Sequence, residues 1–232
     1  MDKSKECECK ECIIKSLFFS NLNIDEFKSI CSSKIQKEFK KGEIIIEQGQ
    51  SLDFLIYLKS GLVKYYIKLH DGRTYIINIS VPFDDFPLLT VFNETHLARY
   101  SMAAIEDSVL CYIPLNLIRE FIMRNGNFAF DFISKLNYIS CKIINNFILI
   151  RSKNLRGRVA FFLLNLAKTI YNGKNVFELP LSRKEIGELI GMTTENVIRA
   201  FSEFRKEKII RINGKEIEIL EKEKLEKISI YG

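Results

Sequence analysis

The chain has 232 residues, of which 47% are hydrophobic and 12% aromatic, so it can bury a core and is not globally disordered. No apolar run approaches the roughly 20 residues of a membrane span, and the polar N-terminus lacks the apolar stretch of a signal peptide, so we expect a cytoplasmic protein with no membrane partner. The net charge of +6 comes from residues 151–232, which carry 17 basic and 11 acidic side chains, whereas residues 1–150 carry 18 of each. A neutral body with a basic C-terminal part favours a module that binds a polyanion.

The cysteines do not indicate a disulfide framework. A chain of this length without a signal peptide is expected in a reducing compartment, where thiols stay reduced. Three of the six lie within the first twelve residues, and this clustering needs its own explanation. The cysteines are Cys7, Cys9, Cys12, Cys31, Cys111 and Cys141.

Residues 23–31 predict a short helix, and residues 35–114 then contain short β-rich runs separated by glycines. Along residues 75–81 apolar side chains alternate with Asn78 and Ser80, which is the period of a strand. The pair Asp71-Gly72 predicts a two-residue hairpin, because glycine tolerates the positive φ of such a turn. Many short antiparallel strands indicate a small barrel or roll.

A long helix follows, with no glycine or proline between residues 127 and 156. Its apolar residues form a nearly continuous seam, which predicts a helix that packs on its own barrel and on a second copy of itself. The alternative is a helix that lies only on the barrel. The seam consists of Phe132, Leu136, Ile139, Ile143, Phe147 and Ile150. A further amphipathic helix is expected over residues 156–171.

The C-terminal segment carries the pattern of a winged helix–turn–helix. Ser182 and Glu185 have the spacing of a capping box that opens a short helix. The turn Gly191-Met192-Thr193 leads to a second helix, and residues 209–212 and 216–220 form a hairpin around Asn213-Gly214.

The second of these helices has two distinct faces. Val197, Ala200, Phe201 and Phe204 fall on one side and are expected to face the domain core. The opposite side carries Glu195, Ile198, Arg199, Ser202 and Lys206. An exposed Glu195–Arg199 ion pair is the simplest interpretation of that side. The DNA-reading interpretation, which we favour, is that Arg199 donates to guanine and Glu195 accepts from cytosine.

The segment PLSRKEIGELIGMTTENVIRAFSEFRKEKIIRINGKEIEI resembles the winged helix–turn–helix of the CRP/FNR superfamily of bacterial transcription regulators. LKSGLVKYYIKLHDGRTYIINI resembles its β-roll, and AIEDSVLCYIP the strand before its dimerisation helix. The resemblance implies an α+β fold: an N-terminal antiparallel β-roll of the cupin-like jelly-roll type, a long dimerisation helix and a C-terminal winged helix–turn–helix. The expected regions are a cysteine-containing head (1–22), a sensor domain (23–127), the dimerisation helix (128–152) and a DNA-binding domain (153–232).

The resemblance also implies a homodimer that binds a palindromic double-stranded DNA operator and contacts RNA polymerase. Glu195 and Arg199 meet the spacing that reads a TGA-like half-site, whereas Ile198 departs from the small or polar residue common between them and could meet a thymine methyl. The predicted DNA contacts are Ser182, Thr193, Thr194, Glu195, Ile198, Arg199, Ser202 and Lys206.

What the roll senses stays open among three alternatives. Cyclic AMP needs a Gly-Glu pair and an Arg-Ser/Thr pair, but Pro87-Leu88 and Ala98-Arg99 stand at these positions, so we reject it. Arg99 could still bind another anion in an effector pocket. Haem would need an axial ligand, and the two candidates, His70 and His96, are expected at the surface.

The third alternative is a 4Fe-4S cluster, as in the oxygen-sensing FNR branch, which requires four thiolates. Cys111 aligns with the distal ligand of that branch, and Cys7, Cys9 and Cys12 could supply the others. The N-terminal spacing is narrower than in that branch, and Cys111 could instead be a small buried strand residue. Zinc bound by the same residues is also possible.

The sequence does not predict an enzyme. It shows no Ser/His/Asp order, phosphate-binding glycine loop or metal-spaced His/Glu pair, and the adjacent Asp84 and Asp85 would point to opposite faces of a strand. A protein-interaction module that does not touch DNA is the alternative to a regulator.

Overall fold

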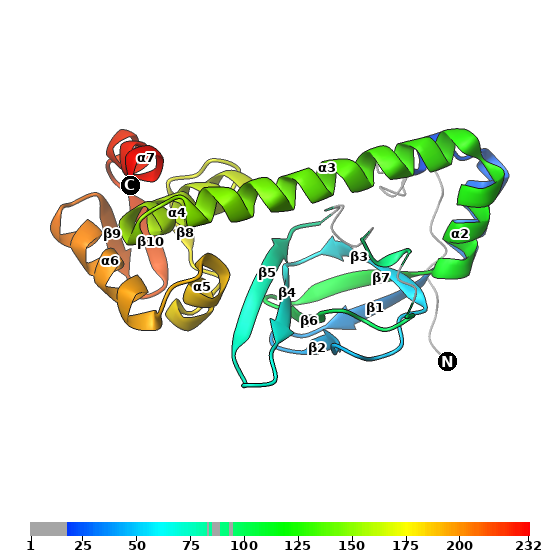
Figure 1. Ribbon diagram of the computed structural model, residues 1–232, viewed down its shortest axis with the longest axis horizontal. Helices are drawn as coiled ribbons and strands as arrows, with labels where there is room; N and C mark the ends of the chain where they lie inside the picture. The colour runs from blue at the N-terminus through cyan, green and yellow to red at the C-terminus, as the bar shows by residue number, and fades with distance from the viewer. Residues whose placement is uncertain (1–17, 83, 85–88, 93–94) are drawn as a thin grey trace. The chain divides into compact units, whose positions relative to one another are not determined.

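The computed structural model describes residues 18–82, 84, 89–92 and 95–232 (Figure 1). The chain divides into two compact units. The first contains the described residues up to Lys68 together with Ile79–Lys142, and the second contains Leu69–Asn78 and Ile143–Gly232. The predicted α+β class is confirmed, with antiparallel sheets, a long helix and a C-terminal helical region (Figure 1).

Two antiparallel sheets form the roll that the glycine-separated runs predict. A three-stranded sheet has the order β1-β7-β3, and a four-stranded sheet has the order β2-β6-β4-β5. In the described part of the roll, all of these strands lie within residues 35–114, the segment that the sequence predicts to be β-rich. The strands are β1 (Ile35–Phe39), β2 (Ile44–Ile46), β3 (Phe54–Ser60), β4 (Val63–Lys68), β5 (Thr74–Ser80), β6 (Ser101–Ala104) and β7 (Ser108–Pro114).

The hairpin between β4 and β5 is present, but its loop is longer than the predicted two residues. The Leu69 N–H donates to the Arg73 carbonyl at 2.9 Å, and the Gly72 N–H donates to the Leu69 carbonyl at 3.0 Å. Gly72 has a φ of 83°, as a three-residue loop with a left-handed last residue requires. The Asp71 carboxylate also accepts from the Arg73 N–H at 3.0 Å, which stabilises the wider loop.

Strand β5 buries a different face from the one that its apolar alternation suggests. Ile76 and Ser80 are buried, whereas Tyr75 is 40% exposed. Ser80 tolerates burial because its hydroxyl donates to the Asp84 carboxylate at 2.9 Å. The alternation therefore identified a strand but not which side of it is covered.

Aromatic side chains form the core of the first unit. The Phe128 ring lies 6.1 Å from Phe19, 6.4 Å from Phe121 and 6.4 Å from Phe132, measured between centroids. Phe19 in turn lies 6.5 Å from Tyr57 of β3. The helices of this unit are the 3-10 turn Phe18–Asn21, α1 (Ile24–Ser33), α2 (Leu115–Arg124) and the first part of α3 (Gly126–Arg151).

Helix α3 is one continuous helix (Figure 1). Its apolar side chains lie on more than one face. Phe132 and Ile139 of the predicted seam are buried within the single chain, so they serve its own core. Leu136, Ile143 and Ile150 are half-buried, and Phe147 is exposed. A second apolar set on α3, Phe130, Ile133, Ile144 and Ile148, is 55% to 71% exposed.

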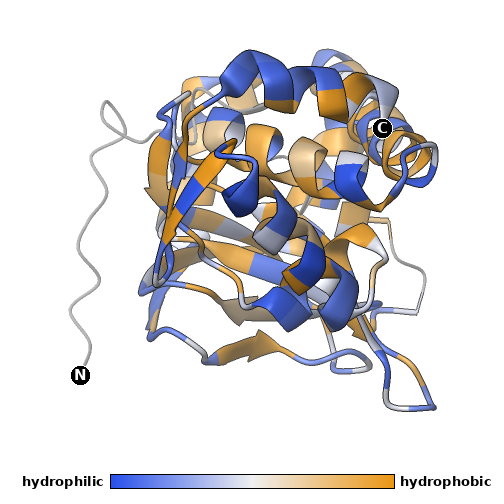
Figure 2. Cartoon of the chain, turned by 90° about the vertical axis from the view of Figure 1, so that its left-hand side faces the viewer, coloured by the Kyte–Doolittle hydropathy of each residue, from blue (hydrophilic) through white to orange (hydrophobic). Residues whose placement is uncertain are grey.

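The second unit is a helical domain with a small sheet of order β8-β10-β9. Helix α4 contacts α5, α6 and α7. Figure 2 shows both hydrophilic and hydrophobic residues on the helices, as expected for amphipathic helices that pack on a core. β8 and α7 were not predicted. The elements are α4 (Leu155–Thr169), β8 (Val176–Glu178), α5 (Arg183–Ile190), α6 (Thr194–Lys206), β9 (Ile210–Asn213), β10 (Glu216–Ile219) and α7 (Lys222–Tyr231).

Among the described residues, no helix combines the length and the apolar character needed to cross a bilayer.

Candidate nucleic-acid interface

A tight turn joins α5 to α6, and capping residues fix the ends of these helices. Ser182 and Glu185 form the predicted capping box at the start of α5. Gly191 ends α5 in the left-handed conformation, with a φ of 66°, which favours glycine. Thr193 then caps α6 by accepting from the Asn196 N–H at 3.3 Å. These contacts produce the predicted helix–turn–helix.

Helix α5 lies close to the following turn at Gly187. The N–H groups of Gly191 and Met192 both donate to the Gly187 carbonyl. A Cβ atom on Gly187 would lie 2.6 Å from the Met192 carbonyl oxygen, so only glycine fits here without a shift. Arg158 of α4 holds the same turn, because it donates to the Gly191 carbonyl at 2.9 Å and to the Lys153 carbonyl at 3.1 Å.

Helix α6 has the two faces that the sequence predicts. Its buried residues are Val197, Ala200, Phe201 and Phe204, which confirms the predicted inner face. On the outer face, Ile198 is 52% exposed and the Arg199 side chain is 66% exposed. Glu195 and Lys206 are also exposed, and Thr194 and Ser202 are half-buried. An acceptor, an apolar group and a cationic donor therefore lie together at the surface.

Arg199 lies beside a different carboxylate from Glu195, the partner in the ion-pair interpretation of this face. The Arg199 Nε atom lies 3.8 Å from the Glu203 carboxylate, one turn further along the helix. The pKa of Glu195 is lowered by hydrogen bonds from its own N–H and from the Thr193 hydroxyl. Glu195 is therefore a carboxylate near the N-terminus of α6, where the helix dipole also favours negative charge.

Two of the predicted DNA contacts also have structural roles. The Ser182 hydroxyl donates to the Glu185 carboxylate at 2.7 Å and accepts from the Glu185 N–H at 3.3 Å. Thr193 accepts from Asn196 as the cap of α6. Their roles as DNA contacts, like those of the other predicted contacts, stay predictions.

Several basic residues that the sequence did not single out hold the interface in place. The Arg156 guanidinium binds the Glu207 carboxylate with two hydrogen bonds of 2.7 and 2.8 Å. The Arg183 guanidinium lies 3.9 Å from the centre of the Phe201 ring, and its partial burial lowers its pKa. Arg211 and Glu218 form an ion pair across the β9–β10 hairpin. None of these pairings has a sequence motif that would reveal it.

The roll contains a small cavity, lined mostly by apolar and aromatic side chains. Ala98 and Tyr100 line it, and the Tyr65 and Tyr100 rings meet edge to face at 5.1 Å. Arg99 is exposed and does not line this cavity, so the structure does not place it in an internal effector pocket. Pro87 and Leu88 lie outside the described residues.

The predicted metal ligands are only partly described. Cys111 is buried on β7, directly opposite Tyr57 of β3, whereas Cys31 is half-buried and Cys141 exposed. Cys7, Cys9 and Cys12 lie outside the described residues. Within the described part of the chain, no three His, Cys, Asp or Glu side chains are grouped to hold a metal ion. His70 and His96 are both exposed, as predicted.

Comparison with protein families matches both units. Residues 36–125 match the model of the cyclic nucleotide-binding domain, and residues 157–228 match that of the Crp-like helix-turn-helix domain. The chain belongs to the CRP/FNR family of transcription regulators. This membership confirms a DNA-binding transcription regulator and the prediction that the chain is not an enzyme.

Relatives in this family match along most of the chain. The transcriptional activator protein Anr of Pseudomonas protegens is 26% identical over 221 residues, which cover 93% of this chain and 90% of the relative. An anaerobic regulatory protein of Haemophilus influenzae is 27% identical over 222 residues, covering 91% and 83% respectively. The structure of FixK2 from Bradyrhizobium japonicum has the same fold, with a TM-score of 0.72, 23% identity and coverage of 84% of this chain and 96% of that one.

Proposed function

We propose that this regulator is a homodimer that reads a palindromic operator with TGA-like half-sites through the outer face of α6. The observation that carries the proposal is the exposed arrangement of Glu195, Ile198 and Arg199 on a helix whose opposite face is buried. Arginine can donate to both guanine O6 and N7, and a carboxylate can accept from cytosine N4. A symmetric dimer would present two such helices to successive major grooves, about 34 Å apart.

The exposed apolar side chains of α3 support the dimer. Phe130, Ile133, Ile144 and Ile148 are more than half exposed on one helix, so the described part of a single chain does not bury them. Apolar patches of this kind mark protein–protein contacts. Ile144→Asp is expected to convert the dimer to monomers in sedimentation velocity, while Lys142→Asp, at an exposed polar position on the same helix, leaves it dimeric.

Selection of duplexes from a randomised pool tests the operator. We expect enrichment of an inverted repeat that contains TGA, and a pool with no inverted repeat would contradict the proposal. Arg199→Glu is expected to abolish binding of the selected duplex while leaving the dimer intact. The control is Lys227→Glu on α7, which reverses the same charge outside α6. Normal binding by the Arg199 variant would exclude α6 as the reading helix.

The signal that controls this regulator is, in our proposal, not cyclic AMP. Among the described residues, the cavity of the roll is lined by Ala98, Tyr100 and other uncharged side chains, with no cation to pair a phosphate. An anionic ligand without a buried partner is costly to hold in such surroundings. The signal then changes the packing along α3 and so the separation of the two α6 helices. We also propose that the DNA-bound dimer contacts RNA polymerase, as the family resemblance implies.

A 4Fe-4S cluster is the cofactor we propose, held by Cys7, Cys9, Cys12 and Cys111. Directly opposite residues point to the same face of a sheet, so Cys111 shares a face with Tyr57, whose ring lies 6.5 Å from Phe19. Phe19 is seven residues after Cys12, a distance of at most about 25 Å along the chain. The described thiol therefore lies on a face that the N-terminal cysteines can reach. One relative is named an anaerobic regulatory protein, which supports an oxygen-linked signal.

Purification without oxygen, followed by visible absorbance with iron, sulfide and zinc analysis, tests this cofactor. A broad oxygen-labile band with stoichiometric iron and sulfide is expected, and it should be lost in Cys111→Ala but kept in Cys141→Ala. Zinc without iron would replace the cluster with a zinc site, and a sharp Soret band would indicate haem. A colourless, metal-free dimer that binds the selected duplex would refute the cofactor and leave the regulator intact.

A further inference from the structure

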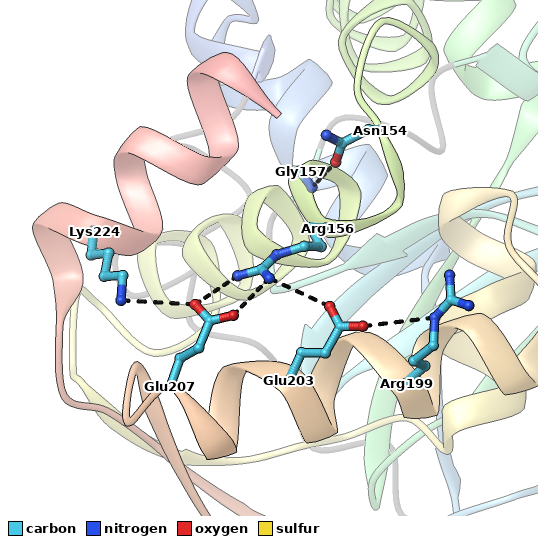
Figure 3. A network of polar contacts seen from close by, with 7 residues as sticks. All are labelled: Asn154, Arg156, Gly157, Arg199, Glu203, Glu207 and Lys224. Carbon is cyan, nitrogen blue, oxygen red and sulfur yellow. Dashed lines mark hydrogen bonds and ion pairs between the residues drawn. The ribbon is translucent and has the colours of Figure 1, made fainter.

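The recognition residue Arg199 stands at the end of a chain of charged groups from three helices (Figure 3). Its Nε atom lies 3.8 Å from one Glu203 oxygen, and the other Glu203 oxygen lies 3.5 Å from Arg156. We propose that Glu203 is a positioning residue that orients Arg199 for a base edge. This inference rests on the proposed reading of DNA by α6.

The geometry of the pair leaves the donors that a guanine requires. Glu203 approaches Arg199 through Nε, and Figure 3 shows the two terminal nitrogens pointing away from the carboxylate. Those terminal nitrogens can supply two parallel hydrogen bonds to guanine O6 and N7. Glu203 therefore need not be displaced when Arg199 binds a base. It restricts the rotamers of a side chain that is otherwise 66% exposed.

Glu203 can keep this position because Arg156, the cation that it contacts on α4, is itself fixed by other residues. Arg156 binds Glu207 with two hydrogen bonds, and its guanidinium lies 5.2 Å from the centre of the Phe204 ring. Lys224 of α7 adds a further charge 3.8 Å from the Glu207 carboxylate. The carboxylate of Glu203 thus lies between a fixed cation on α4 and the reading cation on α6.

The expected effect follows from the cost of ordering a side chain on binding. Immobilising one flexible side chain weakens binding by about two- to tenfold. The Arg199–Glu203 pair is solvent-exposed and its separation of 3.8 Å is long, so we expect the lower end of this range. Binding should weaken by about two- to threefold for each protomer. A dimer on two half-sites should then lose about four- to tenfold.

Glu203→Gln separates positioning from simple electrostatics, because the two predict opposite signs. Removing a negative charge near DNA should tighten all DNA binding. If Glu203 positions Arg199, the variant instead binds the selected duplex about four- to tenfold more weakly, while a scrambled duplex of equal length is bound as before or slightly more tightly. Glu203→Asp keeps the charge but shortens the side chain, and it should show the same loss. Glu226→Gln, an exposed position on α7, is the charge control and should show none.

A double-mutant cycle completes the test. In an Arg199→Ala background, Glu203→Gln should have no further effect on the selected duplex, and thermal unfolding should be unchanged in each Glu203 variant. The positioning role is overturned if Glu203→Gln and Glu226→Gln shift both duplexes equally, or if the loss persists without Arg199. Failure of the unmodified protein to distinguish the selected from the scrambled duplex would instead refute the proposed operator reading.

Discussion

The close approach of α5 to the turn before α6 gives a sharp prediction for Gly187→Ala. The added methyl carbon would lie 2.6 Å from the Met192 carbonyl oxygen, whereas carbon–oxygen contacts are ordinarily about 3.3 Å or longer. The oxygen belongs to the backbone of the turn, so the clash is relieved only if the turn, and α6 with it, moves away from α5 by roughly 0.7 Å or more. Overpacking of this kind costs about 1–3 kcal/mol.

Helix propensity acts in the opposite direction. Alanine is about 0.8–1.0 kcal/mol better than glycine inside a helix. Because the clash is with backbone and not with a flexible side chain, we place the net loss at about 1–2 kcal/mol. For a unit of this size that corresponds to a fall of roughly 5–15 °C in the unfolding temperature.

Scanning calorimetry and fluorescence anisotropy with the selected duplex measure the two consequences, stability and helix placement. Gly126→Ala at the start of α3 is the matched control, because a Cβ there meets nothing within 4 Å. It should leave both properties unchanged or raise stability slightly. An unfolding temperature within about 1 °C of the unmodified protein for Gly187→Ala, with undiminished DNA binding, would refute the reasoning, since the overpacking cost should be several times larger.

Three further predictions concern the packing and capping of the two units. Phe128→Ala should cost about 3–5 kcal/mol in urea unfolding, because its fully buried ring contacts three other aromatic rings; a loss under 1 kcal/mol would contradict this core. Ser182→Ala should cost about 1 kcal/mol through loss of the α5 cap, again by urea unfolding, while Ser152→Ala serves as a non-capping control. The pKa of Glu207 is lowered chiefly by its hydrogen bonds from Arg156, so its stabilising effect is present above its unfolded pKa and is lost as the pH falls through the folded one. Glu207→Gln should therefore flatten the pH dependence of unfolding below about pH 4.5, and an unchanged slope would show that the pair does not stabilise the fold.

The strands and the helix–turn–helix could be predicted because their signals are local. Glycines mark the turns of the roll, and the capping box and Gly191 mark the ends of α5. The buried face of α6 could also be predicted, because its four buried residues are apolar and most residues of its outer face are polar or charged. Each of these features depends on residues within one or two turns of each other.

Other features depend on contacts between distant segments and had no local signal. Glu195 and Glu203 each stand four residues from Arg199, so spacing alone could not decide which one pairs with it. The structure pairs it with Glu203, which Arg156 of α4 also contacts. Similarly, the alternation of β5 does not distinguish the buried Ile76 from Tyr75, which is 40% exposed, and β8 is only three residues long.

The long helix shows the same limit in another form. Apolar residues lie on several of its faces, so periodicity predicts a helix but not which of its apolar residues are buried within the chain. Of the predicted seam, Phe132 and Ile139 pack inside the chain, whereas Phe147 is exposed. The seam that is continuous in the sequence is therefore divided between buried and exposed positions.

The outward apolar face of α3 has a consequence for how much of the protein is folded at a given concentration. In the proposed homodimer, a second copy that covers Phe130, Ile133, Ile144 and Ile148 would bind only the folded chain, so association would stabilise folding by mass action. The unfolding temperature would then rise with the protein concentration. A newly made chain would leave this apolar face exposed until it binds a second copy. The abundance of this regulator in the cell would thus set its lifetime as well as the fraction of operators it occupies.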